Sequence, residues 1–327
     1  MALKICVFGA GAVGGLMAAW LARAGQEVCV VARGAQLTAI RERGLRIFSK
    51  GKEFSINIKV DSDPAKLGAQ DTVIVTVKAQ SLPEVAASIG PLLGPETSIV
   101  TAMNGVPWWF FDRLEFGGGK LRLESLDPGG KLSRAMPTER IVGCVIHLAA
   151  STPEPGLVSH NMGAKLIVGE PGGSNTARTA RIAAALRDAG FEALESDFIE
   201  KEFWVKLLGN VSFNPVSALT LTKADRLIAD AQVKAYMVAI MREVLEIGRA
   251  VGVDAAIDPE ARIDMARALG AFKTSMLQDM EAGKALEIDG LLAGTLEIAA
   301  KAGVAAPFTG SLYSLIRLRA AATGQYQ

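Results

Sequence analysis

Short runs of apolar, often β-branched residues indicate a sheet in the first part of the chain. The runs at residues 72–77 and 98–103 are largely apolar and carry no charge, as expected for strands buried on both faces of a parallel sheet. Turn residues and helical spacing separate these runs, which predicts strands and helices in alternation. Further strands are predicted at 4–8, 27–32, 140–150, 157–160 and 165–169, the last three as an antiparallel extension, and a helix at 176–189.

Beyond about residue 197 the apolar positions recur with the period of an α-helix. Pro215 is expected to disrupt the first helix of this region, because proline lacks an N–H and clashes with the preceding turn. The predicted helices span residues 200–211, 230–251, 259–269, 274–282, 287–302 and 309–322. We therefore predict two domains, an α/β domain at 1–197 and an all-α domain at 198–327.

Composition supports a two-domain globular protein and argues against highly charged partners. The 327 residues exceed what one core usually organises, and half of them are hydrophobic. Lys and Arg number 35 against 34 Asp and Glu, which gives no electrostatic basis for binding nucleic acid or an anionic membrane surface. No uncharged apolar run approaches the ~20 residues that span a bilayer. We expect no nucleic-acid partner and no membrane partner.

The cysteines and histidines show no spacing typical of a metal site. Cys6, Cys29 and Cys144 lie in apolar runs, as expected for reduced core thiols of a cytoplasmic protein. The apolar N-terminus fits a folded strand, turn and helix better than a signal peptide. His147 and His160 have no partner at metal or triad spacing, so a structural role is favoured for both. We expect no metal and no histidine acting as acid or base.

A glycine motif follows the first predicted strand. Residues 9–14 read Gly-Ala-Gly-Ala-Val-Gly and lead into a helical run at 15–23, the setting of a dinucleotide-binding fingerprint. Gly9 permits a tight turn, Gly11 lets a pyrophosphate approach the backbone, and Gly14 lets the helix pack on the strand. We predict an α/β Rossmann-type dinucleotide-binding domain followed by an all-α C-terminal domain, with the active site in the inter-domain cleft. The expected cofactor contacts of this loop are Gly9, Gly11, Ala12, Val13 and Gly14.

The end of the second predicted strand indicates which dinucleotide binds. A carboxylate at this position would accept hydrogen bonds from the free hydroxyls of an adenosine ribose. The chain instead has Ala32-Arg33-Gly34. A guanidinium there suits a 2'-phosphate, so we predict NADP(H) with Arg33 as a contact. A solvated loop arginine is the alternative interpretation.

Polar residues also follow two later predicted strands. Lys78 comes directly after the strand at 72–77, and Asn104 comes directly after the strand at 98–103. In open α/β sheets, ligands bind outside the carboxyl ends of the strands. Either residue alone would more often be an ordinary loop residue, but together they predict contacts with the cofactor.

The segment FWVKLLGNVSFNP, residues 203–215, carries polar side chains within an apolar helix. Lys206 and Asn210 lie one turn apart on one helical face, and the chain continues to Asn214. Two amides beside a lysine favour a polar pocket over an ordinary solvated face. Reduction of a ketone builds negative charge on its oxygen, which an ammonium can stabilise and protonate. Lys206 is therefore the predicted proton donor, and the two asparagines can bind a carboxylate or hydroxyl.

Six short segments occur in the order of a known family across nearly the whole chain. They are GAGAVGG near the N-terminus, VK at Lys78, NG at Asn104, W-x-K-L-x-x-N-x-x-x-N-P at 204–215, TSMLQD at 274–279 and EID at 287–289. Together they resemble the ketopantoate reductase, or 2-dehydropantoate 2-reductase, family.

This resemblance implies NADPH-dependent reduction of 2-dehydropantoate to D-pantoate, a precursor of coenzyme A on the pantothenate pathway. Lys206 matches the family's general acid, and Glu287 matches an acidic residue important for catalysis and ligand binding. Ser275 matches a serine that contacts the substrate carboxylate. The other matching residues are Asn210 and Asn214 for the substrate, and Lys78 and Asn104 for the cofactor.

Two departures from the family pattern widen the choice of substrate. Residues 106–142 look longer than usual, and a further asparagine downstream of Pro215 is absent, because the chain reads LTLTKADRL there. We therefore predict reduction of a 2-oxo acid, with 2-dehydropantoate as the leading candidate. A β-hydroxyacid dehydrogenase-like enzyme and a non-catalytic NADPH sensor are the alternatives. A homodimer is compatible with the sequence.

Overall fold

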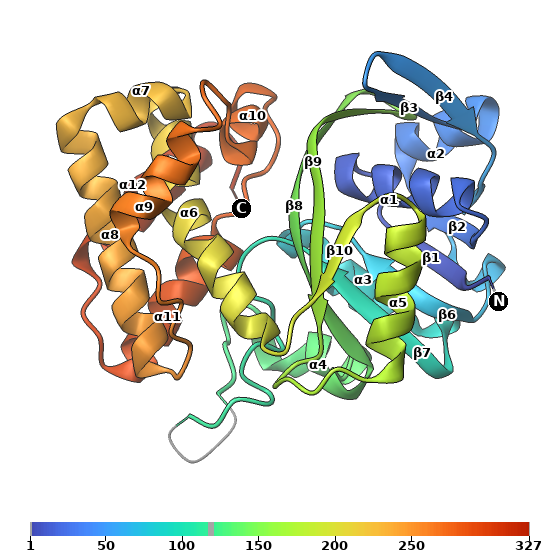
Figure 1. Ribbon diagram of the computed structural model, residues 1–327, viewed down its shortest axis with the longest axis horizontal. Helices are drawn as coiled ribbons and strands as arrows, with labels where there is room; N and C mark the ends of the chain where they lie inside the picture. The colour runs from blue at the N-terminus through green and yellow to red at the C-terminus, as the bar shows by residue number, and fades with distance from the viewer. Residues whose placement is uncertain (1, 117–120, 327) are drawn as a thin grey trace. The chain divides into compact units, whose positions relative to one another are not determined.

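The computed structural model describes residues 2–116 and 121–326, which form two compact units (Figure 1). One unit contains residues up to 103 together with 130–199, and the other contains 104–129 together with the residues from 200 onward. The single domain boundary predicted at 197/198 does not separate residues 104–129 from the first part of the chain. The boundary between domains therefore stays a prediction.

The first unit contains a mixed sheet with the predicted parallel core. Its order is β4-β3-β9-β8-β7-β6-β1-β2-β5, and β10 pairs with β9. The strands from β8 to β5 in this order are parallel to their neighbours, whereas β9 is antiparallel to β8, as predicted for the extension. The strands are β1 (Lys4–Phe8), β2 (Glu27–Val31), β3 (Leu45–Ser49), β4 (Lys52–Ile56), β5 (Lys59–Asp61), β6 (Gln70–Val75), β7 (Leu93–Ala102), β8 (Ile141–Glu154), β9 (Leu157–Gly169) and β10 (Glu192–Glu195).

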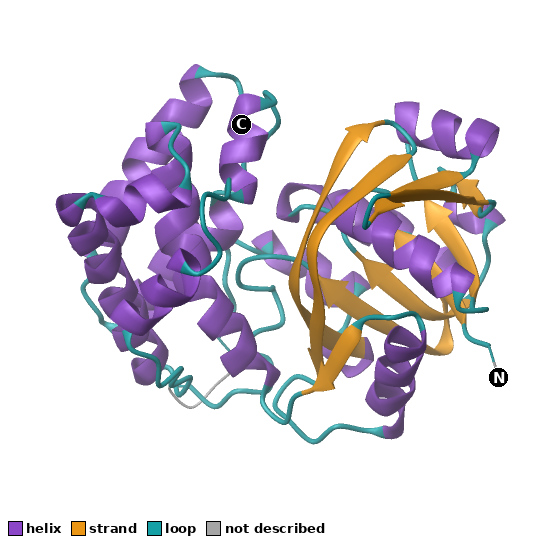
Figure 2. Ribbon diagram, turned by 45° about the horizontal axis from the view of Figure 1, so that its top comes forward, coloured by secondary structure: helices purple, strands orange, loops and turns teal. Residues whose placement is uncertain are grey.

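The sheet curls around helix α1. This helix contacts β1 and β2 and also β3, β4, β8 and β9, which lie toward the other end of the strand order (Figure 2). Leu16, Met17 and Leu21 of α1 are fully buried in the core, so the curl removes apolar surface from water on several sides of one helix. The α-helices of this unit are α1 (Ala12–Arg23), α2 (Gly34–Arg43), α3 (Leu82–Ser88), α4 (Lys131–Ala135) and α5 (Ala177–Asp188).

The two strands predicted at 157–160 and 165–169 are a single strand, β9. Its pairing with β8 shifts register between His147 and Ala149 and again after Ala149. Gly163 adopts a φ of 71°, and a Cβ there would approach the carbonyl oxygen of His147 to 2.7 Å. The predicted gap between the two strands, residues 161–164, therefore lies at an irregularity within one long strand.

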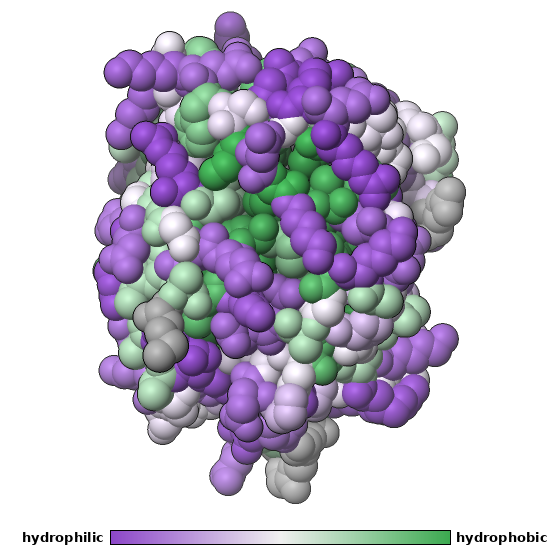
Figure 3. Space-filling view, turned by 90° about the vertical axis from the view of Figure 1, so that its right-hand side faces the viewer, coloured by the Kyte–Doolittle hydropathy of each residue, from purple (hydrophilic) through white to green (hydrophobic). Residues whose placement is uncertain are grey.

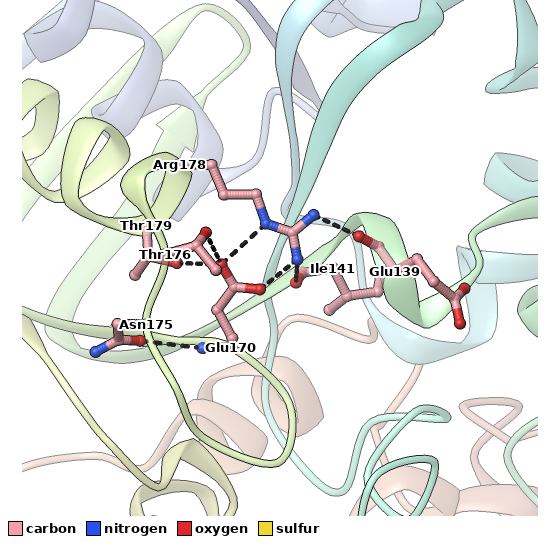
Figure 4. Close-up of polar contacts among 7 residues, drawn as sticks. All are labelled: Glu139, Ile141, Glu170, Asn175, Thr176, Arg178 and Thr179. Carbon is pink, nitrogen blue, oxygen red and sulfur yellow. Dashed lines mark hydrogen bonds and ion pairs between the residues drawn. The ribbon is translucent and has the colours of Figure 1, made fainter.

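A network around Glu170 joins the end of β9 to α5 (Figure 4). The Glu170 carboxylate accepts hydrogen bonds from Thr176, from Thr179 at 2.9 Å and from Arg178 Nε at 3.0 Å. Arg178 also donates to the carbonyl oxygen of Glu139, two residues before β8, and to that of Ile141, the first residue of β8. Burial raises the pKa of Glu170, but these donors outweigh it and hold that pKa below its ordinary value.

The second unit is helical, as predicted. Helix α8 contacts α7, α9, α11 and α12, and Trp204 of α6 donates its indole N–H to the carbonyl oxygen of Val244 in α8 at 3.0 Å. Its helices are α6 (Ile199–Thr220), α7 (Ala224–Ala229), α8 (Ala231–Ala250), α9 (Pro259–Arg267), α10 (Ser275–Glu281), the π-helix η6 (Asp289–Ala293), α11 (Gly294–Ala302) and α12 (Pro307–Ala322).

The prediction that Pro215 disrupts its helix is wrong. Helix α6 continues past Pro215 to Thr220. An interior proline costs about 3 kcal/mol in an isolated helix. Here the residues around it, including Phe213, Val216 and Ala218, are buried, and their packing in the helical unit compensates for the lost hydrogen bond. The polar residues of 203–215 therefore lie along one uninterrupted helix.

The aromatic part of the 106–142 segment belongs to the core of the second unit. Trp109, Phe110 and Phe111 are almost completely buried. The ring of Trp109 lies edge-on to Phe203, 5.5 Å between centroids, and Phe110 lies 5.6 Å from Trp204. These large apolar side chains stabilise the start of α6 by burial.

The same segment is fixed further along by a carboxylate of α11. Glu297 accepts hydrogen bonds from the backbone N–H groups of Glu124 and Ser125, at 2.9 and 2.8 Å, and from the Ser125 hydroxyl at 2.6 Å. Burial raises the pKa of Glu297, but these hydrogen bonds outweigh it, so the pKa lies below its ordinary value. Residues 117–120 lie outside the described residues, so the segment is characterised only on either side of them.

Within the described residues, no helix combines the length and the apolar character that crossing a membrane requires. Figure 3 shows the side of the molecule on which the first unit faces the viewer. Hydrophobic residues gather in the middle of this face, and hydrophilic residues surround them.

Candidate active site

The glycine loop of the first unit has the close packing predicted for it. Gly9 has a φ of 111°, and a Cβ there would come within 2.9 Å of the Val77 side chain. A Cβ on Gly14 would overlap both the Gly9 carbonyl oxygen and the Thr76 hydroxyl. That hydroxyl donates hydrogen bonds to the carbonyl oxygens of Phe8 and Gly9, at 3.2 and 2.9 Å. Thr76, which sequence reasoning missed as a loop partner, thus fixes the turn between β1 and α1.

The N-terminus of α1 is suited to a phosphate group. Gly11 is its N-cap, and a Cβ built on Gly11 would meet no atom within 4 Å, so the space beside it is open. No side chain caps the helix, and its first turn contains no acidic residue. Ala12 and Val13 are partly exposed in this turn. Unpaired N–H groups and the positive end of the helix dipole favour an anion here, so the residues fit the pyrophosphate of a dinucleotide.

The two cationic cofactor candidates of the first unit differ in their surroundings. Arg33 is exposed at the N-cap of α2 and forms an ion pair with Glu84 at 2.5 Å. Lys78 is half-buried, three residues beyond the end of β6, at the N-cap of a short 3₁₀ turn. Both side chains follow the carboxyl ends of parallel strands, where the glycine loop also lies.

The second unit brings Lys206 and Asn104 together. The Lys206 ammonium donates a hydrogen bond to the side-chain oxygen of Asn104 at 2.8 Å, although the residues are 102 positions apart. Lys206 lies on α6, and Asn104 lies two residues after the end of β7. Both side chains are half-buried. The amide oxygen therefore orients the ammonium, which can donate up to three hydrogen bonds in all.

The two asparagines of α6 extend the polar face that begins at Lys206. Asn210 is half-buried one turn after Lys206, and Asn214 is 7% exposed one turn further on. Successive steps of four residues advance about 40° around a helix, so the three side chains form a gently winding row. The continuous course of α6 through Pro215 keeps Asn214 in this row.

Ser275 and Glu287 lie on either side of a tightly held turn. Ser275 is exposed as the first residue of α10, after its N-cap Thr274, and Glu287 is half-buried two residues before η6. Gln325 holds the intervening segment in two ways. Its side-chain amide donates to the carbonyl oxygen of Lys284 at 2.8 Å, and its backbone carbonyl oxygen accepts from the backbone N–H of Leu286 at 3.0 Å.

A second contact fixes the far side of this segment. The Tyr326 hydroxyl donates to Asp289 at 2.8 Å. Burial and this carboxylate raise the pKa of Tyr326 well above its ordinary value, so the hydroxyl stays protonated as a donor. Glu287 thus lies between two anchored positions of the chain.

A pair of glycines positions Asn104 within the second unit. Gly105 has a φ of 80°, and a Cβ there would lie 2.7 Å from the carbonyl carbon of Gly290. The backbone N–H of Val106 donates to the Gly290 oxygen at 2.9 Å. Gly290 belongs to the π-helix η6, and π-helical turns occur frequently at functional sites. Sequence reasoning missed Gly290, although a glycine within a helical pattern signals a close approach of this kind.

No group of three or more His, Cys, Asp or Glu side chains that could hold a metal ion occurs among the described residues. His160 shares hydrogen bonds with Ser49 at 3.0 Å and with the Gly163 carbonyl oxygen at 2.5 Å, and its ring packs edge-on against Trp20. The three cysteines are buried and form no disulfide with one another.

A curled sheet carrying a glycine loop, joined to a helical unit with an oriented lysine, defines a dinucleotide-dependent oxidoreductase. The family models described as ketopantoate reductase PanE/ApbA and ketopantoate reductase PanE/ApbA C terminal match residues 5–113 and 198–320. A 2-dehydropantoate 2-reductase of Mesorhizobium japonicum is 40% identical over 328 residues, covering 99% of this chain and all of the relative. The chain belongs to the ketopantoate reductase family.

Solved structures agree with this assignment. A crystal structure of a protein assigned as a ketopantoate reductase, from Ralstonia solanacearum MolK2, is 46% identical, has a TM-score of 0.95 and covers 100% of both chains. The full coverage includes residues 106–142, the segment that looked unusually long. D-mandelate dehydrogenase in complex with NADH and anilino(oxo)acetate has a TM-score of 0.84 at 20% identity, and this likeness shows the fold alone.

Proposed function

We propose that the protein reduces a 2-oxo acid to a 2-hydroxy acid with NADPH, and that 2-dehydropantoate, reduced to D-pantoate, is its substrate. The observation that carries this proposal is the hydrogen bond between Lys206 and Asn104. It fixes an ammonium in the way that protonation of a developing alkoxide requires. The 40% identical relative is named for the same reaction, and the alignment covers 99% of this chain and all of the relative.

Lys206 acts on the carbonyl oxygen of the substrate. The bound reduced dinucleotide supplies the hydride that reaches the carbonyl carbon. As negative charge grows on the oxygen, an N–H of Lys206 stabilises it and then transfers its proton. Asn104 is uncharged, so it orients the ammonium without a counter-charge that would weaken its attraction for the alkoxide.

The neighbouring polar residues of the second unit bind the substrate in this proposal. Asn210 and Asn214 offer amide donors and acceptors along the same face of α6 as Lys206. Ser275 offers a hydroxyl to the substrate carboxylate at the start of α10. Glu287, held by the contacts of Gln325 and Tyr326, accepts hydrogen bonds from a substrate hydroxyl and assists catalysis. A hydroxyl on the substrate is what distinguishes 2-dehydropantoate from simpler 2-oxo acids.

The first unit supplies the cofactor contacts. The loop residues Gly9, Gly11, Ala12, Val13 and Gly14 hold the pyrophosphate, and their open, uncapped helix start supports this role. Lys78 contacts the cofactor at the end of the adjoining strand, β6. Arg33 selects NADPH through the 2'-phosphate, which competes with Glu84 for the guanidinium. A phosphate carries more charge than one carboxylate, so the exchange favours the ligand.

A substrate panel tests the proposal. Purified protein is incubated with NADPH or NADH and with 2-dehydropantoate, simpler 2-oxo acids or 3-oxo acids, and nicotinamide oxidation is followed by absorbance. We expect turnover of 2-oxo acids with a preference for NADPH and 2-dehydropantoate. Turnover of 3-oxo acids alone would favour the β-hydroxyacid dehydrogenase alternative, and NADPH binding without any turnover would favour a sensor. A cytoplasmic location and a homodimer stay predictions, for fractionation and light scattering to test.

A further inference from the structure

Arg262, on helix α9, is a half-buried cation. Burial lowers its pKa, and within residues 2–116 and 121–326 the structure records no hydrogen bond or ion pair of its side chain. The acidic residues of its own helix are engaged elsewhere: Glu260 pairs with Lys234 at 2.8 Å, and Asp264 pairs with Arg267. Withdrawing an unpaired charge from water is unfavourable, so its persistence here calls for a function.

A glycine in α6 makes room for this guanidinium. A Cβ on Gly209 would overlap the terminal nitrogen of Arg262 and lie 2.9 Å from its central carbon. Glycine inside a helix costs about 1 kcal/mol relative to alanine. The chain accepts this cost in the middle of α6, at a buried position where any side chain would displace Arg262.

The guanidinium lies beside the proposed reaction centre. Gly209 is three residues after Lys206 and directly before Asn210, and side chains three apart on a helix are neighbours about 5–6 Å apart at their Cβ atoms. Around the helix, Gly209 lies about 60° from Lys206. Arg262 therefore places a cation against the turn of α6 that carries Lys206 and Asn210, within the second unit.

We propose that Arg262 recognises the carboxylate of the substrate and so makes the enzyme specific for 2-oxo acids over neutral ketones. In a 2-oxo acid the carboxylate is bonded to the carbonyl carbon. A substrate whose carbonyl oxygen contacts Lys206 therefore places its carboxylate next to Lys206, where a second cation can bind it. A guanidinium binds a carboxylate through two parallel hydrogen bonds, which fixes the neighbouring carbonyl as well as the charge. This inference rests on the proposed function and identifies what its binding site selects.

The test compares a charged and a neutral ligand of similar shape, 3-methyl-2-oxobutanoate and its methyl ester. Their dissociation constants are measured by titration calorimetry with the full chain. We expect Arg262→Gln to weaken binding of the acid by roughly 10- to 100-fold, the range for a lost hydrogen bond to a charged group, and to change ester binding by less than about twofold. Arg262→Lys keeps the charge but loses the paired geometry, and should give an intermediate loss.

Two further variants separate recognition from folding. Gly209→Ala should weaken acid binding as Arg262→Gln does, and adding it to Arg262→Gln should weaken binding no further. Arg267→Gln, on the same helix but exposed and paired with Asp264, is the matched control and should bind as the wild type does. Because Arg262 is unpaired, Arg262→Gln should leave the thermal midpoint unchanged or raise it.

Equal weakening of acid and ester, or a lowered thermal midpoint with unchanged acid affinity, would overturn the inference and indicate a structural role. The outcomes also separate it from the proposed function. Acid binding that depends on Arg262, without turnover of any 2-oxo acid, would refute only the reductase activity. Turnover and acid binding that are both unchanged by substitution of Arg262 would refute only the inference. A wild type that binds neither ligand would refute both the inference and the proposed function.

Discussion

The glycine loop of the first unit and the lysine site of the second unit are built in different ways. The loop is formed by backbone: Gly9, Gly11 and Gly14 matter because they lack side chains, and the Thr76 hydroxyl donates to the carbonyl oxygens of Phe8 and Gly9. The lysine site is formed by side chains, Lys206 and Asn104, brought together over 102 positions. The loop therefore depends on the absence of side chains at positions close together in the sequence. The lysine site depends instead on a tertiary contact between residues far apart in the sequence.

This difference explains what changes each region tolerates. A methyl group added to the loop removes space that a phosphate or a neighbouring backbone needs, so the effect is steric. Removal of a group from the lysine site should leave the fold intact and, under the proposed function, take away a charge at the reacting oxygen. A substitution in one unit should therefore leave a property of the other unit unchanged.

The largest effect is expected from Lys206→Ala. Loss of the proton donor should lower turnover by roughly 100-fold or more, the usual range for a general acid, while NADPH affinity, which depends on the first unit, stays unchanged. Steady-state kinetics and a fluorescence titration of NADPH measure the two quantities. Lys201→Ala, on the same helix, is the control. Wild-type turnover of Lys206→Ala would assign proton donation to another residue.

Next come two alanine substitutions in the glycine loop. Gly11→Ala meets no protein atom, so it should weaken NADPH binding by about tenfold or more through contact with the pyrophosphate and leave the thermal midpoint unchanged. Gly14→Ala overlaps Gly9 and Thr76, so it should lower both affinity and midpoint. Calorimetric titration and thermal melting distinguish them. Unchanged NADPH affinity in Gly11→Ala would contradict phosphate binding at this helix start.

Arg33→Asp should affect one cofactor more than the other. We expect about a tenfold loss of NADPH affinity, because the guanidinium no longer binds the 2'-phosphate and the new carboxylate repels it, with a smaller loss for NADH. Glu84→Gln, which frees Arg33 from its ion pair, should instead strengthen NADPH binding slightly. Equal losses of affinity for NADPH and NADH in Arg33→Asp would contradict a contact between Arg33 and the 2'-phosphate.

A smaller effect is expected at Gln325. Gln325→Glu keeps the shape but replaces the amide donor to Lys284, so the Glu287 segment should loosen and kcat should fall about three- to tenfold at unchanged NADPH affinity. The side chain is 4% exposed, so Gln325→Ala should also lower the thermal midpoint. A change in KM alone would show that Glu287 acts only in substrate binding.

The smallest effect concerns pH and the Glu170 network. Its carboxylate has a pKa below the ordinary value, so its contribution to stability is full above the unfolded pKa of about 4.3 and is lost as pH falls through the folded value. Glu170→Gln should therefore lower the midpoint of the first unit at pH 7, and the difference from wild type should shrink in acid. Melting curves from neutral to acid pH measure this, and a constant difference would contradict the assignment.

The sequence was sufficient where the structure depends on local spacing. The glycine loop, the parallel strands and most helices of the second unit follow from residues close together in the chain. Pro215 was misread because an interior proline weakens an isolated helix, whereas the packing of Phe213 and Val216 holds α6 together. The pairing of Lys206 with Asn104 and the position of Arg262 against Gly209 depend on tertiary contacts that no periodicity reveals.

Chemical rescue tests the central claim most directly. The single-turnover rate of Lys206→Ala is measured with NADPH and 2-dehydropantoate as methylammonium is added. The account predicts a slow variant whose rate rises with the concentration of the protonated amine, while the wild-type rate does not change. A Lys206→Ala rate equal to that of the wild type without any amine would contradict it.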